Sequence, residues 1–144
     1  CRIPDPTDHA VHLVVNVFKD KLRLAAPWSL EDLERLARHR DFDVDALVAR
    51  AKEAHVSNIL AVVAAFMARR DEAWASIARR VGPPPRRAMA ALARAMEASP
   101  ESRATRTLTR FGGDRPRDWA IALFYAARIE WWKIADRRGS RLSF

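Results

Sequence analysis

Apolar residues recur three and four positions apart over the first part of the chain, which is the spacing of one helix face. The residues on this face are Val11, Val14, Val15, Phe18 and Leu22. Asp5 followed by Pro6 is typical of a helix start, with the aspartate as N-cap and the proline at the first helical position. The pattern predicts a central helix that begins there and runs to about Leu24, before Pro27.

Two shorter amphipathic segments follow. Ser29 is a suitable N-cap for a second helix, whose inward face would carry Leu30, Leu33 and Leu36. Asp43 is a suitable N-cap for a third helix, whose buried stripe would consist of Val44, Leu47, Val48 and Ala51.

A longer apolar pattern predicts a fourth helix that starts at Ser57 and continues through Trp74 and Ile77, with a bend near Asp71. Its buried residues would be Ile59, Leu60, Val63 and Phe66. The prolines of segment 81–85 end this helix, because proline lacks the amide donor and fixes φ. We interpret the break as a hinge or turn within one domain.

The rest of the chain predicts a thinly apolar fifth helix over about 86–98, an arginine-rich loop over 99–117 and an aromatic last helix over about 117–138. Helix is predicted throughout, because alternating strand-like runs are absent and alanine is abundant. We therefore expect an all-α fold: a single helical bundle of about six helices, with a long Arg-rich loop before the last helix, over residues 1–144.

The net charge of +8 over 144 residues is carried mostly by arginine. A field of this sign attracts nucleotides, nucleic acid or acidic protein surfaces. No apolar stretch approaches the roughly 20 residues that span a bilayer, so we expect no membrane partner. Cys1 is the single cysteine, which fits a reducing cytoplasm. Because the chain starts at Cys1, we expect it to be the C-terminal part of a longer protein.

Segment 8–54 has a recognisable order of features. His9, His12 and Asn16 lie along one predicted helix, followed by the run Trp28-Ser29-Leu30-Glu31-Asp32-Leu33 and then by Asp41-Phe42-Asp43-Val44-Asp45-Ala46-Leu47 and Ala49-Arg50-Ala51. This order resembles the helical portion of the uncharacterised bacterial nucleotidyltransferase family. Asn16 departs from that family's frequent second histidine, and Phe42-Asp43 only approximates its aspartate–aromatic pair.

The resemblance implies an accessory role. The family's catalytic part holds a nucleoside triphosphate and Mg²⁺ through a Gly-Ser turn and carboxylates, and this combination is not present in the chain. The implied chemistry would lie in a missing N-terminal domain or another subunit. The present chain would support that domain and offer a basic surface to nucleotide or acceptor substrate, with no cofactor of its own.

Arg50 and His55 suggest an alternative function, that of a ribonuclease. Their Arg-x4-His spacing resembles that of HEPN ribonucleases, in which histidine acts as general acid–base and arginine stabilises charge on the phosphate. The family prefers a polar residue directly after the arginine, where this chain has Ala51. The same spacing also arises by chance in an arginine-rich chain.

Two surfaces are candidates for binding. Arg110, Arg115 and Arg117 crowd the loop around the Gly112-Gly113 turn, where arginine forks would suit phosphate or an RNA backbone. Tyr125 and Trp132 lie seven residues apart on the last predicted helix and would dock on a partner protein or on nucleic acid. Partner binding through the second surface alone gives a third function, that of a non-catalytic adaptor.

Two groups of residues raise the question of a metal site. Asp41, Asp43 and Asp45 would suit Mg²⁺, but acidic residues at a helix start cap free amides, which is the interpretation we favour. His9 and His12 share a helix face, but a third ligand at a suitable spacing is absent. We therefore predict no metal site in this chain.

Overall fold

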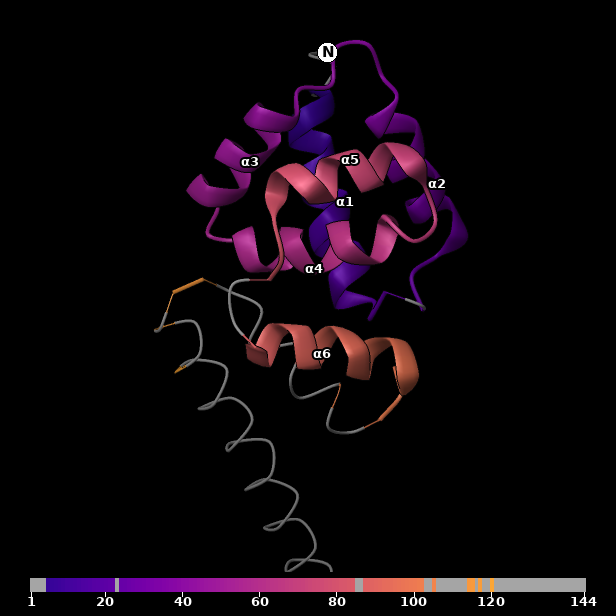
Figure 1. The fold of residues 1–144 in the computed structure, drawn as a ribbon, viewed down its shortest axis with the longest axis vertical. Helices are drawn as coiled ribbons and strands as arrows, with labels where there is room; N and C mark the ends of the chain where they lie inside the picture. The colour runs from indigo at the N-terminus through magenta and orange to yellow at the C-terminus, as the bar shows by residue number, and fades with distance from the viewer. Residues whose placement is uncertain are drawn as a thin grey trace, which may run out of the picture.

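The computed structural model describes residues 5–22, 24–84 and 87–102, together with 105, 114, 115, 117 and 120. Over these residues the fold is all-α, with no strand, as the sequence predicts (Figure 1). Its helices are α1 (Pro6–Lys19), α2 (Pro27–Ala37), α3 (Val44–Glu53), α4 (Ser57–Met67), α5 (Glu72–Val81) and α6 (Arg87–Ala98). The last predicted helix and most of the Arg-rich loop lie outside the described residues.

The start of α1 is confirmed, whereas its predicted end is wrong. The carboxylate of Asp5 accepts a hydrogen bond of 2.7 Å from the amide of Thr7, which also lowers the pKa of Asp5 below its ordinary value. The helix ends at Lys19 instead of near Leu24, because Lys21 and Leu22 both take φ of 58°. This left-handed turn places Leu22 in the core, so burial of that side chain continues after the helix has ended.

The second and third helices differ in how they begin. Helix α2 starts at Pro27 with Ala26 as N-cap and no side-chain cap, so the prediction of Ser29 as the cap is wrong. The fixed φ of Pro27 suits the first helical position and moves the start upstream. The predicted cap of α3 is confirmed, since Asp43 accepts hydrogen bonds of 2.8 Å from the amide of Asp45 and 3.2 Å from that of Ala46.

The predicted fourth helix is in fact two helices, α4 and α5. Helix α4 ends at Met67, and Asp71 takes an extended conformation and accepts a hydrogen bond from the amide of Trp74 at 3.2 Å. Asp71 therefore begins a new helix instead of marking a bend. Its buried carboxylate also pairs with Arg38 at the end of α2.

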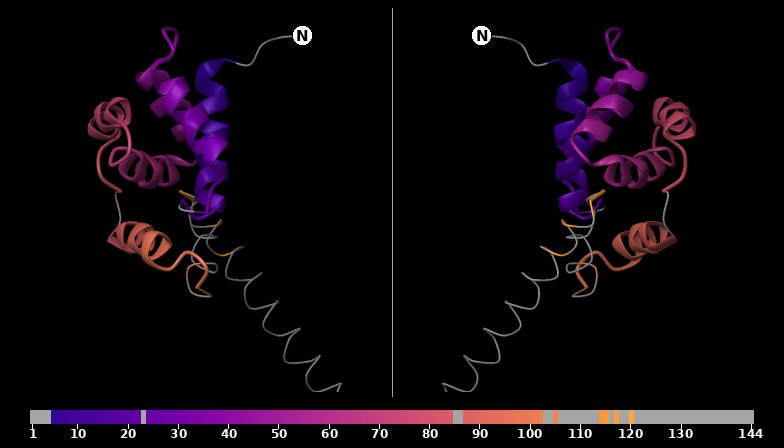
Figure 2. Two further views of the ribbon diagram at one scale, coloured as in Figure 1. Left: turned by 90° about the vertical axis from the view of Figure 1, so that its right-hand side faces the viewer. Right: turned by 90° about the vertical axis from the view of Figure 1, so that its left-hand side faces the viewer.

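Helices α1 and α4 form the centre of the bundle. Helix α1 contacts α2, α3 and α4, and α4 also contacts α3, α5 and α6. Figure 2 shows α4 between α1 and α5, which explains why almost every side chain of α4 is buried. Among the described residues, the largest fully buried side chain is Trp74 of α5, whose indole donates a 3.0 Å hydrogen bond to the carbonyl of Leu33 in α2. This bond joins α5 to α2.

Helix α6 lies below the other five helices (Figure 1) and packs on α4. Gly82 ends α5 with a φ of 81°, a value that glycine adopts without strain. Met89, Leu92 and Met96 join α6 to the same hydrophobic core as α1–α5. Among the described residues, no helix has the length and apolar character required to cross a bilayer.

Candidate functional site

Arg69 and Arg70 lie just beyond the C-cap of α4, the most apolar of the described helices. The apolar run of α4 ends with Phe66 and Met67, and the chain then turns before Asp71 starts α5. Phe66 precedes the two arginines by three and four positions, and in the turn that follows α4 the amide of Arg69 donates to the carbonyl of Phe66 and that of Arg70 to the carbonyl of Met67. The positive charges also lie at the C-terminal end of α4, where the helix dipole favours cations. Local sequence therefore places both guanidiniums beside one aromatic ring.

The two guanidinium carbons lie 6.0 Å (Arg69) and 5.9 Å (Arg70) from the centroid of the Phe66 ring. Both distances are within the range of a cation–π contact. The Phe66 side chain is itself buried, so its ring supports the two arginines from the core side while their charged ends remain exposed.

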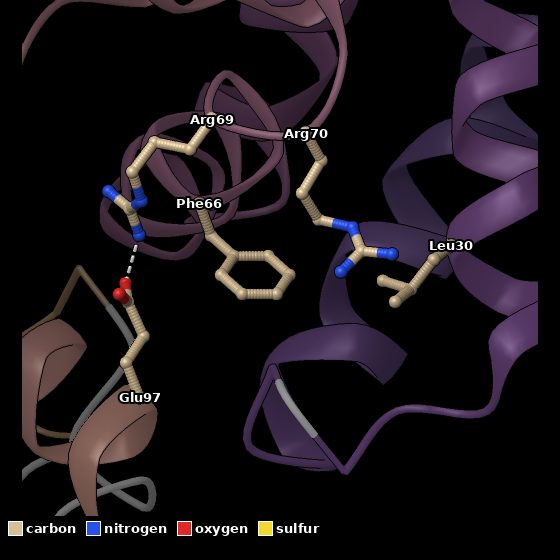
Figure 3. Close-up of a pocket in the computed structure, with 5 residues that line it drawn as sticks. All are labelled: Leu30, Phe66, Arg69, Arg70 and Glu97. Atoms are coloured by element: carbon tan, nitrogen blue, oxygen red, sulfur yellow. Dashed lines mark hydrogen bonds and ion pairs between the residues drawn. The ribbon is translucent and has the colours of Figure 1, made fainter.

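These residues line a pocket of about 440 Å³ between α2, α4 and α6. Figure 3 shows Arg69 on one side of the Phe66 ring and Arg70 on the other, with Arg70 extending toward Leu30 of α2. Glu97 of α6 faces Arg69 across the pocket. We refer to Leu30, Phe66, Arg69, Arg70 and Glu97 as the Phe66 pocket.

The two arginines of the Phe66 pocket differ in their partners. Arg69 forms an ion pair with Glu97. Arg70, in contrast, forms no hydrogen bond or ion pair within the part of the chain that the structure describes, and its contact is with the Phe66 ring. A guanidinium that is held in place but has no carboxylate partner can donate its hydrogen bonds to an anionic ligand.

The sequence pattern does not reveal this pocket. Helical spacing predicts Phe66 as a core residue, which is confirmed, but nothing in the spacing singles out Arg69 or Arg70. One feature of the sequence could have indicated the site: an Arg-Arg pair follows a strongly apolar segment, and Phe66 lies about one helical turn before that pair. The contributions of Leu30 and Glu97 depend on tertiary packing and carry no comparable signal.

Arg50 and His55, the residues of the ribonuclease alternative, have different partners in the structure. Arg50 forms ion pairs with Asp8 at 3.2 Å and with Glu53 at 3.3 Å. His55 lies beyond the end of α3 and contacts Arg115 through its Nε2 atom. No hydrogen bond or ion pair joins Arg50 to His55, both of which are described residues.

The backbone explains the position of His55. Its φ of 56° is that of a left-handed residue just past a helix. Its amide donates to the carbonyl of Lys52 at 3.1 Å, and the next amide, of Val56, donates to Ala51 at 2.8 Å. This pair of hydrogen bonds is a Schellman motif, which ends α3 and starts the turn into α4.

Of the predicted phosphate-binding arginines, Arg115 and Arg117 fall within the described residues, and Arg110 does not. Arg115 contacts His55, and the neighbouring Asp114 accepts hydrogen bonds from the amides of Ser57 (2.8 Å) and Asn58 (2.9 Å). Asp114 therefore caps α4 from a position far along the chain. The predicted partner-binding residues, Tyr125 and Trp132, lie outside the described residues.

The acidic run at the start of α3 has structural partners. Asp43 is the N-cap, as the favoured interpretation predicts, and Asp45 accepts hydrogen bonds from Arg80 at 2.8 and 3.0 Å. The Arg80 hydrogen bonds and charge lower the pKa of Asp45 and raise that of Arg80. His9 and His12 are exposed. Within the described residues, no three His, Cys, Asp or Glu side chains are arranged to hold a metal ion.

Comparison of the chain with protein-family models, with characterised proteins and with solved structures finds no match.

Proposed function

We propose that this chain is the helical accessory part of a nucleotidyltransferase-like protein, and that its Phe66 pocket receives phosphate of the nucleotide or of the acceptor substrate. The order of features in segment 8–54 supports the first half of the proposal. The single observation that supports the second half is Arg70, an arginine fixed on an aromatic ring beside a pocket and without an acidic partner among the described residues.

The charge of the chain agrees with this role. With a net charge of +8, the chain attracts anions from a distance, whereas Arg70 gives them a defined place to bind. Arginine suits this purpose because its planar fork matches pairs of phosphate oxygens. Leu30 and Phe66 add apolar surface to the same pocket, against which the non-phosphate part of a ligand can pack.

Catalysis would take place outside this chain. The described residues offer no suitable group of carboxylates for Mg²⁺, so the metal site of a nucleotidyltransferase does not fit them. The catalytic domain or subunit would supply it.

An accessory part needs a surface for the domain that it supports. Trp28 and Leu24 are large apolar side chains with 68% and 46% of their surface exposed, and they lie in and just before α2. Large exposed aromatic side chains are common at protein interfaces. Trp28 is also part of the run that carries the resemblance. We propose that this end of α2 contacts the catalytic domain.

Calorimetric titration of the chain with ATP tests the proposed phosphate binding. We expect saturable binding that Arg70→Ala weakens about tenfold or more, as befits lost hydrogen bonds between charged groups. Arg79→Ala is the matched control, since Arg79 is exposed, lies on α5 and forms no hydrogen bond or ion pair within the described residues. Equal losses in both variants would indicate unspecific attraction by net charge and would contradict the proposal.

A further inference from the structure

We propose that the Phe66 pocket takes a ligand with at least two adjacent phosphoryl groups, and that Glu97 imposes this requirement by occupying Arg69. This inference rests on the proposed function, because it assumes that phosphate binds at Arg70. It adds the chemical class of the ligand, a diphosphate or triphosphate ester in preference to a monophosphate, and it assigns a residue that determines the preference.

The arrangement of charges in the pocket supports this inference. The guanidiniums of Arg69 and Arg70 both lie on the Phe66 ring, so they belong to one site. Only Arg70 has no acidic partner there, since Glu97 of α6 already pairs with Arg69 (Figure 3). A single phosphoryl group therefore gains one available guanidinium. A ligand with a second phosphoryl group carries enough negative charge to compete with the Glu97 carboxylate for Arg69 as well.

The ion pair between Arg69 and Glu97 is suited to such exchange. The side chain of Arg69 is 55% exposed and that of Glu97 is 32% exposed. Ion pairs that are open to solvent contribute little to stability and are screened by salt. Phosphate oxygens, in contrast, can accept two parallel hydrogen bonds from one guanidinium. A polyphosphate can therefore replace Glu97 at Arg69 at little cost to the fold.

The fold can also accommodate the exchange. Glu97 lies near the C-terminal end of α6, but α6 is held in the core by Met89, Leu92 and Met96, all of which are buried. Release of the carboxylate from Arg69 therefore leaves the apolar contacts of α6 in place.

The test is a calorimetric titration of the full chain with pyrophosphate and with inorganic phosphate, both without divalent cations. The variants are Arg70→Ala, Glu97→Gln, Arg69→Ala and the double variant of Glu97 and Arg69, with the circular dichroism and urea midpoint of each as folding controls. We expect the wild-type chain to prefer pyrophosphate. Glu97→Gln should raise the affinity for inorganic phosphate roughly five-fold and narrow that preference. In the Arg69→Ala background, Glu97→Gln should have no such effect.

The outcomes separate this inference from the proposed function. If pyrophosphate binding is lost in Arg70→Ala but inorganic phosphate binds no more tightly to Glu97→Gln than to the wild-type chain, the inference is wrong and the proposed function stands. An equal gain from Glu97→Gln with and without Arg69 would show a general charge effect and would also overturn the inference. If neither the wild-type chain nor Glu97→Gln binds either anion, both proposals are wrong.

Discussion

The guanidinium carbon of Arg70 lies 5.9 Å from the centroid of the Phe66 ring, and this contact holds a charged group that has no acidic partner among the described residues. Phe66 therefore has two structural roles. Its ring fills the end of the core of α4, and its outer face fixes the position of Arg70.

Phe66→Leu distinguishes the two roles, because leucine keeps an apolar side chain in the core but lacks the aromatic face that contacts Arg70. An exposed cation–π contact contributes about 0.5–1 kcal/mol. We therefore expect pyrophosphate affinity to fall roughly two- to five-fold, as measured by calorimetry. Phe42→Leu is the control, since Phe42 also packs against the core but does not line the Phe66 pocket. An equal decrease in both variants would mean that Phe66 affects binding only through stability.

Trp74→Phe tests the hydrogen bond between α5 and α2. The indole of Trp74 donates to the carbonyl of Leu33 at 3.0 Å, and both residues are fully buried. Removal of the donor leaves that carbonyl without its partner and leaves part of the indole volume empty, which should lower the free energy of unfolding by about 2–4 kcal/mol. Urea unfolding measures the change. Trp28→Phe, at a 68% exposed tryptophan, should change the free energy by less than about 0.5 kcal/mol.

Substitution at His55 tests the turn between α3 and α4. His55 has a φ of 56°, a conformation that costs an ordinary L-residue about 1–2 kcal/mol and glycine much less. Both His55→Gly and His55→Ala remove the contact with Arg115. The glycine variant should nevertheless unfold at a higher urea concentration than the alanine variant, with a difference in free energy of about 1 kcal/mol. Equal midpoints would show that this backbone conformation is not maintained in solution.

The ion pair between Asp45 and Arg80 predicts a pH dependence. The Arg80 hydrogen bonds lower the pKa of Asp45 below its ordinary value of 3.8, so the unfolded chain takes up the proton at a higher pH than the folded chain does. The stabilisation is therefore complete above that ordinary pKa, and it is lost as the pH falls through the lower pKa of the folded state.

An NMR titration of the Asp45 carboxyl should give a midpoint below 3.8 in the wild-type chain and a midpoint near 3.8 in Arg80→Ala. Unfolding midpoints of the two proteins should converge as the pH falls below this range. A titration of Asp45 that Arg80→Ala leaves unchanged would contradict the assigned cause.

The parts of the fold that follow from local chemistry could be predicted from the sequence. The caps at Asp5 and Asp43 depend on residues two or three positions away, and both are present in the structure. The apolar faces of the helices also follow from helical spacing, as the buried Val14, Phe18 and Leu33 illustrate.

Two predicted helix ends are wrong, and the causes lie in the backbone conformation and in tertiary contacts. The end of α1 depends on the left-handed conformation of Lys21 and Leu22, two residues that rarely adopt it, and burial of Leu22 accompanies the turn. The division of α4 from α5 depends on Asp71, whose carboxylate pairs with Arg38 from a distant part of the chain. Long-range pairs of this kind cannot be inferred from one sequence, and for the same reason the contribution of Glu97 to the Phe66 pocket was not predicted.

The most direct test of phosphate binding at Arg70 is heteronuclear NMR of the arginine Nε–H groups during addition of ATP to the intact chain. The account predicts that the Arg70 signal shifts and saturates, while the signal of Arg79, which is exposed on α5, stays in place. An Arg70 signal that does not move, or one that moves only in proportion to Arg79 without saturation, would contradict it.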